Sequence, residues 1–153
     1  MSVSIEVAET AEQFDLGGRL IRAYAEFLGL DLEFQGFSSE LASLPIMYGP
    51  PKGALLLSSF EGVHVGAVGL REFEPGVAEM KRMYVLPDYH GMGIGKALTE
   101  ALLCQAKEMG YGSVRLDSVR ELDKALRLYQ AFGFKEIEPY RFNRVLPRFH
   151  GRF

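Results

Sequence analysis

Apolar and polar residues alternate in several short segments of the chain and recur at helical spacing in longer ones. A period of two predicts strands, and apolar residues three or four positions apart predict amphipathic helices. Thr10 and Gln13 have the spacing of a capping box, while Pro45 is expected to stop the second helix and to leave the next residues irregular. We predict strands at Ser2–Val7, Gly53–Phe60, Val63–Phe73, Val77–Val85, Ser113–Asp117, Phe134–Ile137 and within Phe142–Phe149, and helices at Thr10–Gly29, Ser39–Leu44, Ile94–Met109 and Ser118–Phe132.

The element order β-α-α-β-β-β-α-β-α-β-β predicts an α/β (α+β) fold, with a mixed sheet and helices on both faces. The 153 residues, 48% of them apolar, are enough for one domain that spans residues 1–153. The net charge of −3 argues against a nucleic-acid partner. No apolar run is long enough to span a membrane, and the single cysteine, Cys104, cannot form an internal disulfide. We therefore expect a cytoplasmic protein with neither nucleic acid nor membrane as its partner.

A glycine-dense turn, Gly91–Gly95, joins the predicted strand Val77–Val85 to the helix that begins at Ile94. Glycines leave backbone N–H groups uncovered, and the positive end of the helix dipole lies at the same point. This combination favours an anion site for a phosphate or pyrophosphate. The alternative is a tight turn without a ligand.

Two familiar phosphate-binding loops are excluded by the residues present. A P-loop needs Ser or Thr after Gly-Lys and a glycine five positions earlier, but Ala97 and His90 occupy those places. A dinucleotide-binding loop needs a third glycine, which is replaced by Lys96 or Leu98 depending on the register. A nucleotide-binding domain is therefore disfavoured.

The remaining pattern, His90-x-x-Gly93-x-Gly95, resembles the coenzyme A pyrophosphate loop of the GCN5-related N-acetyltransferase (GNAT) superfamily. Further along, the segment from Asp123 to Phe134 resembles the Asn-x-Ala-x-x-Leu-Tyr-x-x-x-Gly-Phe segment of that superfamily. The two motifs stand in the expected order, and the resemblance covers nearly the whole chain. It implies the GNAT acyl-CoA N-acyltransferase fold, in a small stand-alone protein of bacterial type, and acetyl-CoA as cosubstrate without a metal.

The resemblance also implies which residues hold coenzyme A. The end of the strand before the loop would part from its neighbour and bind pantetheine through its backbone, with the Val85 N–H as a donor to the thioester carbonyl. His90 replaces the usual Arg or Gln, at a position that contributes chiefly its backbone amide. Asp123 replaces the usual Asn and cannot donate a hydrogen bond when ionised. The expected cofactor-binding residues are Met83, Tyr84, Val85, His90, Gly91, Met92, Gly93, Ile94, Gly95, Lys96, Asp123 and Tyr129.

Two residues are candidates for the chemistry. Tyr129 stands where a family tyrosine protonates or hydrogen-bonds the leaving sulfur; alternatively, it is a core aromatic. Glu79 has the spacing to His90 that a general base has in the histone acetyltransferase branch; alternatively, Glu79 and Lys81, which alternate along the strand, belong to a solvated cross-strand ion pair. Strand alternation places Glu79 on the same face as Met83 and Val85.

The resemblance further implies that the acceptor site forms from the first two helices, their connection and the C-terminal segment. This region is rich in aromatic residues, which suits a small amphipathic amine or an amino-acid-like molecule. Charged residues near the expected cleft, at Arg71-Glu72 and Lys81-Arg82, include one that could bind an anionic group. The acceptor-binding candidates are Tyr24, Phe27, Gln35, Tyr48, Arg71, Tyr140 and Asn143.

These expectations together favour an acetyl-CoA-dependent N-acetyltransferase that acts on a small primary amine by direct transfer. The alternative is a non-catalytic acyl-CoA-binding or sensing module with the same fold. The expected partner is a small-molecule amine, and the resemblance leaves a homodimer open.

Overall fold

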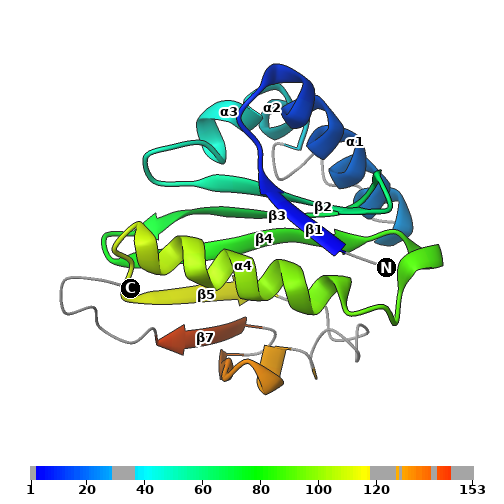
Figure 1. Cartoon of the computed structure of the whole chain (residues 1–153). Coiled ribbons are helices and arrows are strands. Elements are labelled where there is room, and N and C mark those ends of the chain that lie inside the picture. The colour runs from blue at the N-terminus through cyan, green and yellow to red at the C-terminus, as the bar shows by residue number, and fades with distance from the viewer. Residues whose placement is uncertain (1–2, 29–36, 118–126, 128, 139–140, 146–153) are drawn as a thin grey trace.

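The structure is a computed structural model that describes residues 3–28, 37–117, 127, 129–138 and 141–145. Its helices and strands follow the predicted order closely (Figure 1). They are β1 (Val3–Val7), α1 (Ala11–Leu28), α2 (Phe37–Ala42), α3 (Leu44–Met47), β2 (Ala54–Phe60), β3 (Val63–Glu74), β4 (Val77–Val85), the 3-10 helix η2 (Pro87–Tyr89), α4 (Ile94–Glu108), β5 (Ser113–Asp117), β6 (Lys135–Glu138) and β7 (Arg141–Val145).

The described strands form a seven-stranded sheet in the order β1-β2-β3-β4-β5-β7-β6. β4 and β5 are parallel, and every other neighbouring pair is antiparallel. A parallel pair needs a crossover, which α4 provides. The prediction of a mixed sheet is confirmed.

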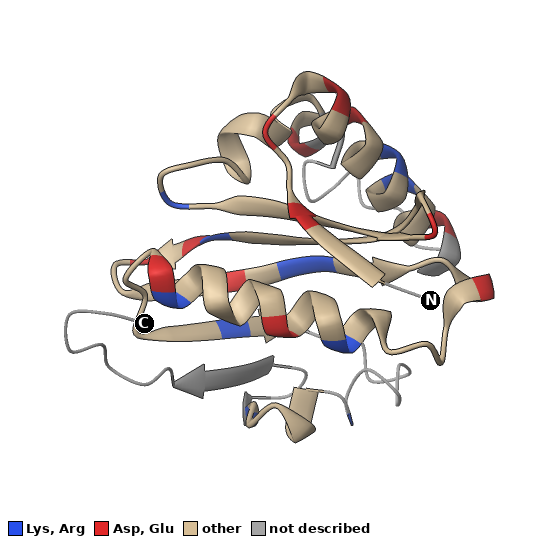
Figure 2. Ribbon diagram, in the orientation of Figure 1, with Lys and Arg blue, Asp and Glu red and all other residues tan. Residues whose placement is uncertain are grey.

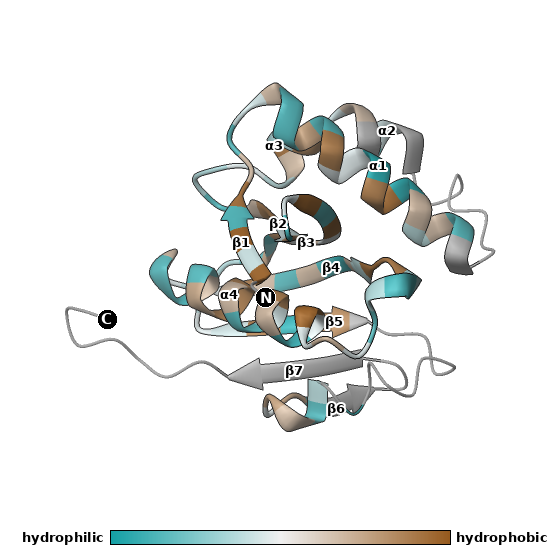
Figure 3. Ribbon diagram, turned by 45° about the vertical axis from the view of Figure 1, so that its right-hand side comes forward, coloured by the Kyte–Doolittle hydropathy of each residue, from teal (hydrophilic) through white to brown (hydrophobic). Residues whose placement is uncertain are grey.

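Helices cover both faces of this sheet, as predicted. α1, α2 and α3 lie together on one face, and α4 lies on the other (Figure 1). Apolar and polar stretches alternate along α1, as expected for a helix with one buried side (Figure 3). Strand β2 reads as a nearly continuous apolar run because it is buried on both sides: Leu56 packs in the core under α4, whereas Leu55 and Leu57 pack in the core under α1.

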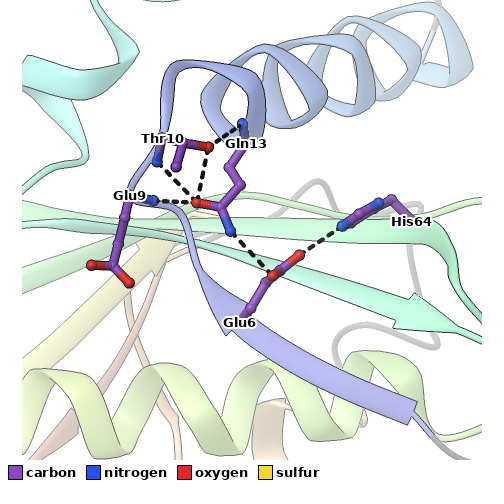
Figure 4. Close-up of polar contacts among 5 residues, drawn as sticks. All are labelled: Glu6, Glu9, Thr10, Gln13 and His64. Carbon is purple, nitrogen blue, oxygen red and sulfur yellow. Dashed lines mark hydrogen bonds and ion pairs between the residues drawn. The ribbon is translucent and has the colours of Figure 1, made fainter.

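The predicted capping box starts α1. The Gln13 amide donates to Thr10 Oγ1 at 3.1 Å, and Gln13 Oε1 accepts from the Thr10 amide at 2.9 Å (Figure 4). The Gln13 side chain also donates to Glu6 in β1, and the other Glu6 oxygen lies 2.6 Å from His64 Nε2 in β3. The cap therefore ties the start of α1 to two strands.

One prediction about the connection after α1 is wrong. Pro45 does not end a helix. It lies in the first turn of α3, where backbone amides have no partner within the helix, so the missing amide of proline costs no helical hydrogen bond. The preceding helix, α2, already ends at Ala42. The helix predicted at Ser118–Phe132 lies mostly outside the described residues, although residues 127 and 129–131 are helical.

Within the described ranges, no helix combines the length and apolar character needed to cross a membrane.

Candidate functional site

β4 loses its neighbour on one side part-way along its length. It pairs with β5 as far as Met80, whereas it pairs with β3 as far as Val85. The Leu86 amide donates to the Val65 carbonyl in β3 at 2.8 Å. Since neighbouring residues of a strand turn their N–H groups to opposite edges, the Val85 amide points to the side away from β3. Beyond Met80, the described strands thus leave one edge of β4 without a paired strand.

A bulge at Arg82 interrupts β4 beside this edge. Arg82 has a φ of +59°, and the register against β3 shifts there. Met80, Met83 and Val85 all contact the core under α4. Glu79 precedes Met80 and therefore lies on the opposite face. The prediction that Glu79 shares a face with Met83 and Val85 is wrong, because the bulge adds one residue and exchanges the two faces.

The glycine turn connects this strand end to α4. Gly91 and Gly93 have φ values of +82° and +79°, in the left-handed region that side chains disfavour. Gly93 is the N-cap of α4 and has no side chain to bond the first helical amides. Ile94 is buried and anchors the helix, while Lys96 in the same turn is exposed. Uncapped amides, a helix dipole and an exposed lysine make this turn attractive to an anion.

His90 fastens the turn to the end of β4. Its Nε2 lies 2.7 Å from the Val85 carbonyl oxygen. Because a carbonyl only accepts, Nε2 carries the proton and donates it. The imidazole side chain therefore contributes to the loop in addition to its backbone amide.

Tyr129 lies in the core close to the same strand end. It is 5% exposed and makes an edge contact with Phe134, with the ring centroids 5.9 Å apart. Burial, together with the nearby Tyr24 phenol, raises the pKa of Tyr129, so its hydroxyl keeps its proton at neutral pH. Tyr24 in α1 contacts Tyr84 in β4, with centroids 5.7 Å apart. The structure thus brings Tyr24, an acceptor-binding candidate, near Tyr129, a catalytic candidate. Its burial is compatible with a role for Tyr129 at the sulfur and with a role as a core aromatic.

Glu79 is paired with Arg71, its cross-strand partner in β3. Arg71 Nε lies 3.2 Å from Glu79 Oε1, and Glu79 is 8% exposed. The structure thus shows a cross-strand ion pair, as in the alternative given above, although the carboxylate is buried. The role of Glu79 as a general base stays a prediction.

A buried ion pair that the sequence analysis missed lies next to these residues. Arg82 donates to both oxygens of Glu40 in α2, at 2.8 and 2.9 Å, and both residues are less than a tenth exposed. Burial alone would raise the pKa of Glu40, but the hydrogen bonds and charge of Arg82 outweigh burial and hold it below its usual value. Acidic and basic stretches follow each other along β4 (Figure 2). No local pattern links residues 42 positions apart, so the sequence carried no signal for this pair.

Tyr48 belongs to this ion pair instead of the acceptor site. Its hydroxyl donates to Glu40 Oε2 at 3.2 Å, and the side chain is completely buried. Its ring lies against Gly69, where a Cβ would come within 2.7 Å of it. The expectation that Tyr48 lines the acceptor site is corrected accordingly: it supports Glu40 from within the core.

The sequence model of the acetyltransferase (GNAT) family matches residues 25–134, which include the strand end, the glycine turn and Tyr129. This chain belongs to the GNAT family. The acetyltransferase is also similar to an uncharacterized N-acetyltransferase of Schizosaccharomyces pombe, 37% identical over 146 residues that cover 94% of this chain and 90% of that protein.

Solved structures agree on the fold of this GNAT protein. An acetyltransferase of the GNAT family from Staphylococcus aureus has a TM-score of 0.79 at 20% identity, covering 94% of this chain and all of that one. A Salmonella typhimurium protein described as a putative acetyltransferase with its cofactor acetyl-CoA has a TM-score of 0.70 at 15% identity, covering 100% and 99% of the two chains. At these identities the likeness shows the fold.

Several predicted site residues of the acetyltransferase lie outside the described residues. They are Gln35, Asp123, Tyr140 and the side chains of Phe27 and Asn143; the backbone of Asn143 pairs in β7 with Arg115 of β5. Across the described ranges, no three potential metal-ligating side chains gather into a group.

Proposed function

We propose that this GNAT protein is an acetyl-CoA-dependent N-acetyltransferase that moves an acetyl group directly to the primary amine of a small or amino-acid-like molecule. One observation carries the proposal: β4 parts from β5 at Met80 and runs to a glycine turn at the start of α4, with no described strand paired along one of its edges. An extended thioester arm would bind along this edge, and a pyrophosphate would bind at the turn. The acetyl-CoA named in the description of the Salmonella typhimurium structure supports the same donor.

The donor would be held mainly by the backbone. Val85, and Met83 two residues earlier, would hydrogen-bond the pantetheine arm and the thioester carbonyl through their amides. The amides from Gly91 to Lys96 would bind the pyrophosphate, with the Lys96 ammonium adding charge. Tyr84 lies in the same strand as Met83 and Val85, and Met92 lies in the glycine turn. Asp123 would contact the pantetheine as an acceptor.

The reaction makes three demands on the protein. An amine with a pKa near 10 must lose a proton, the developing oxyanion needs donors in place, and the leaving thiolate needs a proton or a nearby hydrogen-bond donor. As the nitrogen bonds to the acetyl carbon and the carbon–sulfur bond breaks, the Met83 and Val85 amides would bind the oxyanion. Tyr129, kept protonated by its burial, would donate a hydrogen bond to the sulfur and stabilise the leaving thiolate.

Glu79 would take the proton that leaves the amine. It lies four residues before Met83, and because the bulge takes up one of them the separation along the strand is about 10 Å, so water would have to relay the proton. The ion pair with Arg71 keeps the carboxylate oriented. Tyr24 and Arg71 would line the acceptor side.

The experiment that tests this function follows thiol release from acetyl-CoA in the presence of a panel of primary amines. At least one amine is expected to accelerate release well above the rate with acetyl-CoA alone. Tyr129→Phe should lower kcat about 100-fold, within the range for a lost proton transfer, without changing the unfolding temperature. If acetyl-CoA binds but no amine accelerates release, the chain is a binding module. If kcat survives in Tyr129→Phe, the tyrosine is a core residue.

A further inference from the structure

Five charged side chains surround the bulge of β4 on the face covered by α1, α2 and α3. Two pairs are complete: Arg82 with Glu40, at 2.8 and 2.9 Å, and Arg71 with Glu79, at 3.2 Å. Among the described residues, Lys81 has neither an ion-pair nor a hydrogen-bond partner. These five described side chains therefore carry three positive charges and two negative charges.

Lys81 lies where an acceptor would meet the donor. It is the first residue of β4 after the pairing with β5 ends, and it precedes the proposed thioester-binding amides. Its cross-strand partner is Gly69, which has no side chain. The ring of the fully buried Tyr48 lies against Gly69.

The surroundings of Lys81 favour an incoming anion. The side chain is partly buried, and burial together with Arg82 and Arg71 lowers its pKa, although Glu79 and Glu40 oppose this. Both of those carboxylates are already engaged by arginines at close range. A carboxylate from a ligand would reduce the repulsion among Lys81, Arg82 and Arg71, and the two existing ion pairs would not have to break for it to bind.

We propose that Lys81 binds a carboxylate of the acceptor, so that the substrate class is amines that also carry a carboxylate, such as amino acids. This inference rests on the proposed N-acetyltransferase function and narrows its acceptor.

The test compares pairs of acceptors that differ in one charge: an amino acid and the corresponding amino-acid amide. The wild type is expected to show a kcat/KM about 10-fold or more higher for the acid, the size expected for a hydrogen bond between charged groups. Lys81→Gln should reduce the ratio to about 1, mainly through KM for the acid, whereas Lys81→Arg should retain it. Lys52→Gln is the control, because Lys52 is an exposed lysine paired with Glu72.

An equal kcat/KM of the wild type for the acid and the amide would overturn the proposal. An equal decrease in kcat/KM for both acceptors in Lys81→Gln would also overturn it. If no amine of either kind reacts, the proposed activity fails, and binding decides the present inference. Amino acids are then titrated calorimetrically into the complex with coenzyme A. Binding to the wild type that disappears in Lys81→Gln supports the carboxylate site, and absence of binding to the wild type refutes it.

Discussion

Glu40 and Arg82 form an ion pair that water hardly reaches. Two hydrogen bonds join the guanidinium to the carboxylate, and the Tyr48 hydroxyl adds a third to the same carboxylate. Replacing a buried pair by apolar residues is often neutral, but removing one partner leaves a buried charge uncompensated. This pair is therefore a sensitive point in the attachment of α2 to β4.

Glu40→Gln should lower the free energy of unfolding at neutral pH by about 3 kcal/mol. The folded-state pKa of Glu40 is below its usual value, so the stabilisation is present above the unfolded pKa and is lost as pH falls through the folded pKa. The difference in the free energy of unfolding between the wild type and Glu40→Gln should therefore become smaller at acidic pH.

Denaturant unfolding at about pH 7 and about pH 3, on either side of the ordinary carboxyl pKa, measures both effects. Glu100→Gln is the matched control, because Glu100 is exposed on α4 and should change stability little. A Glu40→Gln protein as stable as the control, or a difference that does not depend on pH, would contradict the role given to this pair.

At the scale of elements, the start of α4 depends on backbone conformation. Gly93 has a φ of +79° and caps the helix, and nothing lies within 4 Å of the place where a Cβ would stand. Gly110, just after α4, has a φ of +90° and equally open surroundings. An alanine at either position costs about 1–2 kcal/mol through backbone strain alone.

The two glycines differ in their place relative to the proposed donor site. Gly93→Ala should weaken coenzyme A binding about 10-fold or more, because the strained turn no longer presents its amides to the pyrophosphate. Gly110→Ala should lose similar stability but keep its Kd. Calorimetric titration of coenzyme A into each variant measures this. The same Kd for both variants would mean that the glycine turn does not bind the pyrophosphate.

Some of these elements could be predicted from the sequence and others could not, depending on whether local residues determine where they begin and end. β4 and β5 were predicted with their observed bounds, because turns and glycines bracket apolar alternation there. The bulge at Arg82 was not predicted: nothing in Lys81-Arg82-Met83 signals a positive φ, and the local pattern is the same with or without it. Pro45 was misread because the same residue suits either the end of one helix or the first turn of the next.

At the scale of the whole molecule, the fold class and sheet followed from sequence, because burial on both faces of the central strands and amphipathic helices leave few arrangements. The proposed donor side of the site was predictable for a related reason, since it would use the backbone at a glycine turn. The acceptor side was not. Its ion pairs join α2, β3 and β4, and these long-range contacts form only when the sheet and helices pack together.

The central claim is that this GNAT protein transfers the acetyl group of acetyl-CoA to the nitrogen of an amine. Thiol release alone can also come from hydrolysis of the thioester, so the decisive measurement follows the acetyl group. The protein is incubated with acetyl-CoA labelled isotopically in the acetyl group and with the amine that best accelerates release, and the products are analysed by mass spectrometry. The account predicts labelled N-acetyl product in equal amount to the coenzyme A released; labelled acetate in its place, or no labelled amide with any amine, would contradict it.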